Sequence, residues 1–331
     1  MPPTGRSSAH HADAFAALAE PYRRELQLHC YRMLGSYEDS EDLVQETLLR
    51  AWRARHGFEA EGPSSFRAWL YRIATNACID ALAKRPRRVM PHDVAPASDP
   101  EVVPPEEPDV PWLQPYPDRL LASSDDEPDA VVVEKETIEL AFIAAIQHLP
   151  PRQRAVLLLR DVLGFSAKEA ATLLQTSVAA ANSALQRARA TLRERLPRRR
   201  LDWTPSSELS AQERSLLQRY MDAQLRGDAA ALEAVLREDA RVSFPPLPLW
   251  YDGRESFRKA AERHAAPGEY RFVATGANMQ PAAAIYLRRP GDTAFRPLAL
   301  EVLRIEDGQV VEIVDFGQLE LFAAFDMPAE L

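Results

Sequence analysis

Cysteine is scarce in this sequence of 331 residues, which contains only Cys30 and Cys78. Neither has a second cysteine at the spacing of a metal-binding pair, so a disulfide framework and a thiolate zinc site are excluded and a reducing compartment is expected. No run approaches the roughly eighteen apolar residues that a membrane-spanning helix needs, and residues 1–14 lack the apolar core of a secretory signal. We therefore expect a cytoplasmic protein with no membrane partner.

Charge is unevenly distributed, although the net charge of −9 taken alone argues against a nucleic-acid partner. Acidic residues dominate residues 92–130, where eleven Asp and Glu face one base, Arg119, and nine prolines occur. Proline fixes φ and has no N–H to donate, so neither helix nor sheet is expected there. We predict an extended, acidic, proline-rich linker over residues 91–130.

Basic residues flank this linker. Residues 178–200 contain seven arginines and one acid, Glu194, and a second cluster of Lys and Arg occupies residues 84–88. Such density is typical of a helix and tail that face DNA. Two basic modules joined by an acidic linker indicate that the linker can occupy a positively lined channel that nucleic acid would otherwise fill.

Apolar residues recur with helical period over residues 14–54, with a break at Gly35-Ser36, and again after residues 62–65. Polar groups gather on the outward faces of these two stretches. The earlier face carries Asp42, Gln45, Glu46 and Leu49, and the later one carries Asn76, Asp80 and Lys84, which are spaced four residues apart along one stripe. Such faces are most often the solvated surface of a helical bundle.

Two motifs in this first module carry a family resemblance. Residues 39–47 read DSEDLVQET and residues 66–76 read FRAWLYRIATN. At this separation they resemble region 2 of the extracytoplasmic-function (ECF) sigma factors of bacterial RNA polymerase. The resemblance implies that the face of Asp42, Gln45, Glu46 and Leu49 binds the coiled coil of the polymerase β′ subunit. It also implies that a loop over residues 56–65 holds a base flipped out of the DNA. The implied contacts with the −10 promoter element are Asn76, Asp80, Lys84 and Arg85.

The second module, residues 131–200, has the pattern of a helix-turn-helix. Helices are predicted over 133–149 and 152–163, and Ser166 with Glu169 forms a capping box that opens a short helix. Ser177 caps a last helix, which in this motif lies in the major groove. We expect its core face to contain Val178, Ala181, Leu185, Ala188 and Leu192. The candidate DNA contacts are Asn182, Ser183, Gln186, Arg187 and Arg189.

Together with the first module, this pattern resembles sigma region 4, which binds the −35 element and the polymerase β flap. Relatives commonly carry more polar residues where this helix has Ala179, Ala180 and Ala184. Fewer donors therefore reach the bases, and phosphate contacts are expected to dominate.

The third module, residues 201–331, has helical periodicity over residues 210–238, followed by four strand-like runs. The predicted strands are 270–274, 283–287, 298–305 and 310–316, with a turn at 306–309. Helices followed by an antiparallel meander indicate an α+β domain.

Residues 243–254 read SFPPLPLWYDGR and, with the hairpin at 305–313, resemble the SnoaL-like branch of the cone-shaped NTF2-like fold. With WLQPYPD at 112–118, the whole chain resembles the SigG-like sigma factors that carry a fused SnoaL-like domain.

SnoaL relatives include polyketide cyclases that use a buried carboxylate as a general base. Asp239 is a further candidate carboxylate, and the expected pocket residues are Arg241, Trp250, Tyr251, His264 and Asp315. We expect no catalysis, no cofactor and no metal, because a cone of this kind serves binding as readily as chemistry.

The linker contains large apolar side chains that nothing local can bury. We expect this regulatory segment to dock on the SnoaL-like domain within the chain. Its residues are Trp112, Leu113, Tyr116 and Asp118.

The predicted architecture is therefore multidomain. Two all-α sigma modules precede an α+β cone, and the predicted segments are 1–13 (a disordered N-terminus), 14–90 (region 2), 91–130 (linker), 131–200 (region 4) and 201–331 (SnoaL-like).

The protein is predicted to be a sigma factor that binds core RNA polymerase and promoter DNA. We expect its C-terminal domain to regulate this activity in cis, and the pocket of that domain to suit an unidentified small ligand. The rival interpretation is a helix-turn-helix regulator fused to a ligand-binding or cyclase-like SnoaL domain. A repressor needs no polymerase-binding face, so the face of Asp42 and Glu46 discriminates between the two.

Overall fold

The computed structural model describes residues 15–58, 63–102, 108–121, 137–196 and 209–331. The predicted disordered segment 1–13 lies outside these residues. Contacts divide the chain into two compact units, Met1–Arg87 with Ala141–Trp203 and Arg88–Leu140 with Thr204–Leu331. Within the described part, no helix is both long and apolar enough to cross a membrane.

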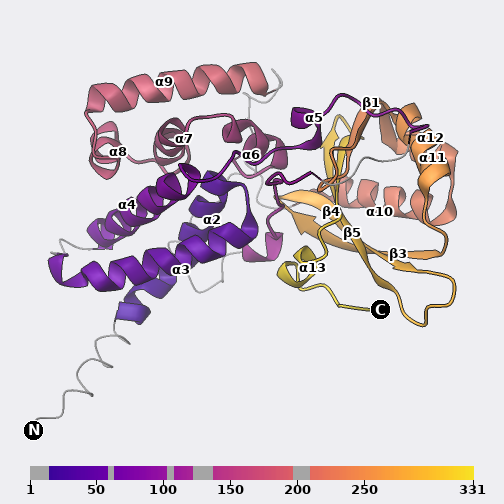
Figure 1. Ribbon diagram of the computed structural model, residues 1–331, viewed down its shortest axis with the longest axis horizontal. Helices are drawn as coiled ribbons and strands as arrows, with labels where there is room; N and C mark the ends of the chain where they lie inside the picture. Colours follow the sequence, from indigo (N-terminus) through magenta and orange to yellow (C-terminus); the bar gives the residue numbers. More distant parts are fainter. Residues whose placement is uncertain (1–14, 59–62, 103–107, 122–136, 197–208) are drawn as a thin grey trace, which may run out of the picture. The chain divides into compact units, whose positions relative to one another are not determined.

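The first unit begins with three neighbouring helices (Figure 1). The helix α2 ends at Gly35, whose φ of 70° is the left-handed conformation that glycine adopts without strain. The hydroxyl of Ser36 then accepts a hydrogen bond from the Asp39 N–H at 3.2 Å and caps α3. The elements are η1 (Glu20–Tyr22), α2 (Arg23–Leu34), α3 (Tyr37–Ala54), η2 (Arg55–Gly57) and α4 (Pro63–Leu82).

The second half of this unit is the helix-turn-helix. The capping box is confirmed: Ser166 Oγ accepts from Glu169 N, and Glu169 Oε2 accepts from Ser166 N at 2.7 Å. The hydroxyl of Ser177 caps the last helix through Ala180 N at 3.1 Å. The elements are α6 (Leu140–Gln147), α7 (Pro151–Leu157), the π-helical turn η5 (Leu158–Val162), α8 (Ala167–Leu173) and α9 (Val178–Arg195).

Two predictions for this module were wrong. A helix was predicted over residues 133–149, of which 133–136 lie outside the described residues. The helix α6 begins at Leu140, because Leu140 N donates to Gln280 Oε1 at 2.9 Å and Ile138 O accepts from Asn278 Nδ2 at 2.7 Å. These long-range bonds hold residues 137–139 outside the helix. Val178, expected in the core, is 41% exposed, and the buried face of α9 begins one turn later at Ala181.

The second unit is built on a sheet of six strands in the order β2-β1-β6-β5-β4-β3. The predicted meander from β3 to β6 is antiparallel, as expected. Residues 236–238, predicted as helix, instead begin β1, because Leu236 pairs in parallel with Val310 of β6. The strands are β1 (Leu236–Ser243), β2 (Trp250–Asp252), β3 (Glu269–Ala277), β4 (Gln280–Arg288), β5 (Arg296–Glu306) and β6 (Gln309–Phe316).

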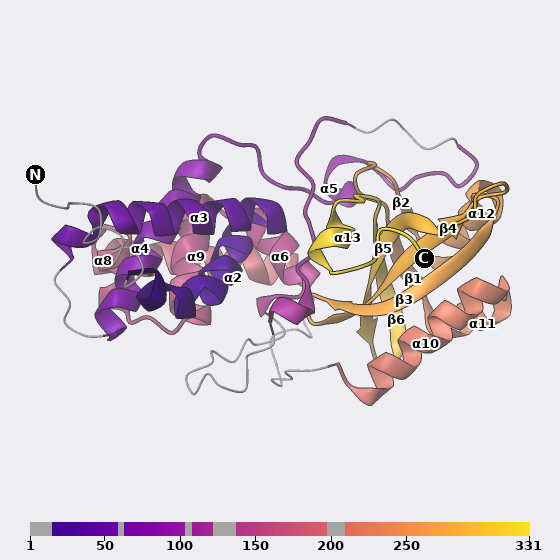
Figure 2. The same cartoon turned by 90° about the horizontal axis from the view of Figure 1, so that it is seen from below.

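Helices cover one face of this sheet. The helix α10 lies along the sheet and contacts β3 and β4, while α12 packs against β1 and β2 (Figure 2). A capping box of Ser210 and Glu213 begins α10, and Gly227 ends it at a φ of 61°. The remaining elements are α5 (Pro91–Val94), η3 (Asp118–Leu120), α10 (Ala211–Arg226), α11 (Ala229–Val235), α12 (Arg254–His264) and α13 (Leu321–Ala324).

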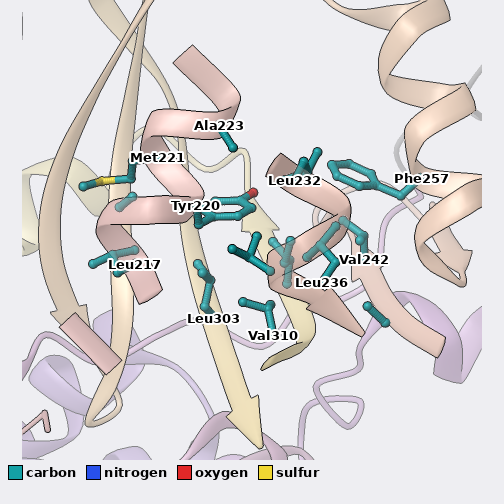
Figure 3. Close-up of a cluster of buried hydrophobic side chains, with 14 of the residues drawn as sticks. Leu217, Tyr220, Met221, Ala223, Leu232, Leu236, Val242, Phe257, Leu303 and Val310 are labelled. Atoms are coloured by element: carbon teal, nitrogen blue, oxygen red, sulfur yellow. The ribbon is translucent and has the colours of Figure 1, made fainter. Parts of the chain in front are cut away.

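The main core of this unit lies between the helices and the face of the sheet that they cover. Figure 3 shows Tyr220 of α10 beside Leu303 of β5 and Val310 of β6. Each such side chain is almost fully removed from water, which contributes about 1.5–3 kcal/mol per large aliphatic side chain. This packing fixes the face of the sheet that the helices cover.

Candidate polymerase, DNA and regulatory sites

The predicted polymerase-binding residues share one face of α3. Asp42, Gln45 and Leu49 are exposed, and Leu49 keeps 42% of its surface in water although it is a large aliphatic residue. Glu46 is partly exposed and accepts a hydrogen bond from Arg50 at 2.7 Å, which lowers the pKa of Glu46. The opposite face of α3 is buried through Val44, Thr47 and Ala51. This face is therefore an accessible, acidic surface with an apolar residue at one end.

The predicted −10 contacts are only partly on a helix. Asn76 is half-buried and Asp80 exposed on α4, but α4 ends at Leu82, so Lys84 and Arg85 lie beyond the helical stripe that the four-residue spacing indicated. Arg85 pairs with Asp39 at 2.6 Å, and Arg50 lies 3.7 Å from Asp80. Salt bridges thus connect this group to the side of α3 that carries Arg50 and Asp39.

Aromatic side chains lie on both sides, along the sequence, of residues 59–62, the part of the predicted base-binding loop that lies outside the described residues. Phe58 stacks on Trp69 with ring centroids 4.7 Å apart and meets Phe66 at 5.5 Å. The guanidinium of Arg55 lies 3.4 Å above the ring of Trp52. Phe66 and Trp69 are buried, so these rings pack against one another within the first unit.

All five predicted −35 contacts are exposed on α9, namely Asn182, Ser183, Gln186, Arg187 and Arg189. Arg189 already has an acidic partner, because its Nε and one terminal nitrogen donate to the two carboxylate oxygens of Asp161 at 2.8 and 2.7 Å. This pairing raises the pKa of Arg189 and offsets part of its attraction for phosphate. Arg187 and Arg189 are therefore not equivalent.

The linker segment that the structure describes belongs to the second unit. We call residues 88–102 and 108–121 the linker strap. Its two parts meet where Val89 and Trp112 form a β-bridge, with Leu113 N donating to Val89 O at 3.1 Å. Trp112 is 3% exposed, and Leu113 and Tyr116 are fully buried. The aromatic residues of the linker are therefore part of a packed core.

The strap is attached to the turn between β3 and β4. Tyr116 N donates to Asn278 Oδ1 at 2.7 Å, and Asn278 N donates to Tyr116 O at 2.9 Å. Met279 N donates to Asp118 Oδ1 at 2.7 Å. A Cβ on Gly276 would lie 2.3 Å from Asp118 Oδ2, so only glycine allows this approach. Backbone and side-chain bonds together fix the strap at this turn.

The same turn also holds the chain just before region 4, through the bond from Asn278 Nδ2 to Ile138 O. Asn278 and Met279 have φ of 57° and 56°, the left-handed pair that a two-residue hairpin turn requires. Methionine rarely adopts this conformation, so the surrounding bonds must maintain it. Asn278 was not found by sequence reasoning, although an asparagine between two strand-like runs is a turn signal. We call Asn278 and its partners Tyr116 and Ile138 the Asn278 clasp.

The expected pocket residues lie on two faces of the sheet. Arg241 and Trp250 face the strap: Trp250 Nε1 donates to Ala95 O at 2.9 Å, and the Arg241 guanidinium lies 5.2 Å above the Trp250 ring. Tyr251 and Asp315 face the helices instead. Asp239 is exposed and paired with Arg237. His264 ends α12, and its side chain lies outside the described residues.

A second buried carboxylate lies beside Asp315. Glu301 of β5 is directly opposite Asp315 of β6 and is 4% exposed. Tyr220 donates to Glu301 Oε2 at 3.0 Å, and Gln224 donates to Tyr220 Oη at 2.9 Å. Burial raises the pKa of Asp315 to about 7, and burial and the nearby Asp315 raise the pKa of Glu301 well above its usual range. This pair can hold a proton at neutral pH.

The two cysteines, distant in sequence, meet in the core of the first unit. Cys30 of α2 and Cys78 of α4 are both buried and free. The Cys30 thiol and burial raise the pKa of Cys78 well above its ordinary value, so its thiol is unreactive in the folded chain. In the residues that the structure describes, no group of three or more His, Cys, Asp or Glu side chains could hold a metal.

Comparisons with known proteins agree with this architecture. Family models for sigma-70 region 2, sigma-70 region 4 and a SnoaL-like domain match residues 18–88, 139–192 and 217–313. The chain is 44% identical to the ECF RNA polymerase sigma factor SigG of Mycobacterium tuberculosis, over 96% of this chain and 85% of that protein. It is 29% identical to SigW of Bacillus subtilis, over 56% of this chain and 89% of that one. The crystal structure of the M. tuberculosis ECF sigma factor SigJ aligns with a TM-score of 0.58 at 19% identity, over 96% of this chain and 99% of that one.

A region 2 module and a region 4 helix-turn-helix in one chain define a transcription initiation factor of the sigma-70 class. This chain belongs to the ECF RNA polymerase sigma factors and carries a C-terminal SnoaL-like domain. It binds core RNA polymerase and promoter DNA and directs promoter-specific initiation, and the family is not one of enzymes. The rival interpretation of a free helix-turn-helix regulator is not favoured.

Proposed function

We propose that the SnoaL-like domain regulates this sigma factor in cis through the linker strap. The observation that carries the proposal is the Asn278 clasp, in which one side chain bonds Tyr116 of the strap and Ile138 before region 4. One turn of the SnoaL-like domain thus bonds two of the segments that lead toward the first unit, the strap and the residues before α6. A change in that domain therefore reaches both of these segments at once.

The clasp affects polymerase binding through geometry. Region 2 and region 4 contact different promoter elements, and the length of free chain between them limits their separation. When the strap is docked, the free chain between region 2 and region 4 is shorter. When the strap is released, the free chain regains its full length. Couplings of this kind are typically about 1–3 kcal/mol, which corresponds to a change in affinity of roughly 5–150-fold.

We also assign the individual contacts. The acidic face of α3 binds the β′ coiled coil, and region 4 binds the β flap and the −35 element. Asn76, Asp80, Lys84 and Arg85, together with the loop at 56–65, bind the −10 element. The exposure of Asp80, Lys84 and Arg85 and of the outward residues of α3 and α9 supports the assignment. Because the protein acts on promoter DNA, we place it in the cytoplasm.

The clasp can be tested with two substitutions of one residue in the full-length chain. Asn278→Gly keeps the left-handed backbone but removes both side-chain bonds, while Asn278→Asp keeps the acceptor for Tyr116 N and loses the donor to Ile138 O. We expect Asn278→Gly to raise the affinity for core polymerase by about fivefold or more, and Asn278→Asp to give a smaller rise. Fluorescence anisotropy with labelled polymerase measures both.

The matched control is Asp307→Gly. Asp307 holds the corresponding left-handed position, with φ of 50°, in the turn between β5 and β6. We expect wild-type affinity for this variant. If Asn278→Gly also behaves like the wild type while hydrogen exchange shows a released strap, the domain is not an internal regulator. A fall in affinity would mean that docking assists polymerase binding instead of restraining it.

A further inference from the structure

Polar atoms without hydrogen-bond partners gather beneath the linker strap. Ser243 of β1 has no exposed surface, and its hydroxyl has no partner among the residues that the structure describes. The Nε of Arg241 and the Nδ1 of His92 are also buried and lack a partner within the described ranges. Burying a polar atom without a hydrogen bond is unfavourable, so three such atoms in one place indicate a site that a ligand completes.

The register of the sheet brings these atoms to one place. Arg241 and Ser243 are two residues apart on β1, so both side chains point to the face of the sheet opposite the helix-covered core. Trp250 of β2 is directly opposite Ser243, and the Arg241 guanidinium lies 5.2 Å from the centre of the Trp250 ring. His92 of α5 meets the same ring from the strap, with ring centroids 6.3 Å apart. The three atoms therefore lie around one indole ring.

The charges around this ring favour an anion. Glu312 of β6 accepts a hydrogen bond from Arg304 Nε at 2.8 Å, whereas its carboxylate lies 4.0 Å from the Arg241 guanidinium. Arg304 therefore compensates much of the charge of Glu312, and Arg241 retains positive charge for a ligand. His92 adds no charge at pH 7, because burial and the nearby Arg241 lower its pKa. A neutral imidazole still has one N–H, so each of the three unpartnered groups can donate to an anionic oxygen.

The cluster is open to solvent on one side. Arg241 keeps 40% of its side chain exposed and Trp250 is half-buried, whereas Ser243 lies at the inner end. A ligand can therefore enter beside the indole ring and extend inward to the hydroxyl. Donors at a guanidinium and a hydroxyl suit a carboxylate, and an indole face suits a flat apolar ring.

We propose that Arg241, Ser243, His92 and Trp250 form a binding site for a small aromatic carboxylate. Arg241 and Ser243 donate to the carboxylate from the sheet, His92 donates to it from the strap, and the ring of the ligand packs on Trp250. The buried pair of carboxylates at the centre of the helix-covered face is a separate feature, because it lies on the other side of the sheet.

This site joins the strap to the sheet. His92 belongs to the strap, and Trp250 bonds the strap at two further points, because Trp250 Nε1 donates to Ala95 O at 2.9 Å and Ser98 N donates to Trp250 O at 2.8 Å. A ligand that contacts both parts binds the docked strap more tightly than the released one and so stabilises docking. Its effect on polymerase rests on the proposed function, in which a docked strap lowers the affinity for core polymerase.

Calorimetric titration of the full-length chain with three probes tests the chemistry of the ligand. Benzoate has both the ring and the charge, and we expect it to bind with a dissociation constant of about 1 mM or lower. Benzamide has the ring without the charge, and acetate has the charge without the ring. Each of these should bind about tenfold more weakly or worse, because it loses one half of the site. If benzoate does not bind, or if either other probe matches it, the proposed site is wrong.

Ser243→Ala separates a binding role from a structural one. Because the hydroxyl of Ser243 makes no hydrogen bond in the free chain, its removal should leave the melting temperature unchanged or higher, while the affinity for benzoate falls about tenfold. The control is Ser40→Ala, at a buried serine whose hydroxyl donates to Tyr37 O at 2.5 Å. This control should lower the melting temperature and leave the affinity for benzoate unchanged. A lower melting temperature with wild-type affinity in Ser243→Ala would assign the hydroxyl to the fold instead.

Arg241→Met tests the charge of the site. We expect it to weaken benzoate binding by about tenfold or more and to leave acetate and benzamide equally weak. Arg237→Met is the matched control, because Arg237 lies on the same strand and its guanidinium already bonds Asp239. Benzoate affinity should be unchanged in this control. Equal affinity for benzoate in Arg241→Met and the wild type would contradict the proposal.

Hydrogen exchange and polymerase affinity separate the ligand site from the proposed function. Benzoate should slow amide exchange over residues 89–98 of the strap and lower the affinity of the wild-type chain for core polymerase several-fold, with neither effect in Arg241→Met. If benzoate binds without slowing exchange there, the ligand does not contact the strap and the site as proposed is wrong. If benzoate binds and slows exchange while polymerase affinity is unchanged, the ligand site is supported and the proposed regulation through the strap fails.

Discussion

Asp315 and Glu301 are two carboxylates paired across β5 and β6 in a largely apolar core. Placing two like charges there is unfavourable, so the folded domain retains a proton that the unfolded chain would release. Tyr220 stabilises the pair by donating to Glu301, and Gln224 orients Tyr220. At the residue scale, the stability of this domain is therefore linked to pH.

The sign of that linkage follows from the raised pKa values. Between about pH 4, where an unfolded Asp ionises, and about pH 7, where Asp315 ionises in the folded chain, the folded state binds more protons. We therefore expect the free energy of unfolding of the SnoaL-like domain to fall by roughly 2–4 kcal/mol across this window. Hydrogen exchange in β5 and β6, corrected for intrinsic rates, measures it. Asp315→Asn should make the fall smaller without abolishing it, because burial still raises the pKa of Glu301, and the exposed control Asp239→Asn should leave the fall intact. A fall as large in Asp315→Asn as in the wild type would exclude Asp315 as a cause.

Arg187 and Arg189 differ in their partners, which predicts different effects on DNA binding. Arg187→Ala should weaken promoter binding about equally across sequences and reduce the slope of log affinity against log salt by about one unit. Arg189→Ala should change this slope less, because Asp161 already neutralises Arg189. Asp161→Asn should in turn increase binding to non-specific DNA. Loss at a single base position in either arginine variant would show that the residue reads sequence.

At the element scale, the acidic face of α3 makes the sharpest prediction. Asp42→Lys combined with Glu46→Lys reverses the charge of this face and sets a second positive charge beside Arg50, so it should repel any basic partner surface and abolish holoenzyme formation. Glu20→Lys, at an exposed acidic residue of η1 outside α3, is the control. Size-exclusion chromatography with core polymerase measures complex formation. Unchanged complex formation in the double variant would contradict the assignment of this face.

The elements that local sequence specifies were predictable. Ser166 and Ser177 cap helices through bonds to residues three positions away, so their roles are visible in short motifs. The meander from β3 to β6 was predictable because its strands are consecutive along the chain and pair with their sequence neighbours. Sequence patterns also located the exposed face of α9, whose periodicity depends only on the helix itself.

Elements set by distant partners were not predictable. The start of α6 depends on Asn278 and Gln280, which lie 140 residues away from their partners. The strand β1 pairs in parallel with β6, at the far end of the domain. Glu301 was missed because its burial depends on Tyr220, 81 residues earlier.

At the scale of the whole molecule, the Asn278 clasp holds two segments of the chain at one turn of the SnoaL-like domain. These are the strap, through Tyr116, and the residues before α6, through Ile138. Release of the clasp is therefore expected to free both segments together.

The central claim is that this chain directs promoter-specific initiation under restraint by its own SnoaL-like domain. Run-off transcription on fragmented genomic DNA, with core polymerase and either the wild-type chain or Asn278→Gly, tests it most directly. We predict discrete start sites that core polymerase alone does not use, with more transcript but the same start sites for Asn278→Gly. No initiation above the level of core polymerase alone, from either protein, would contradict the account.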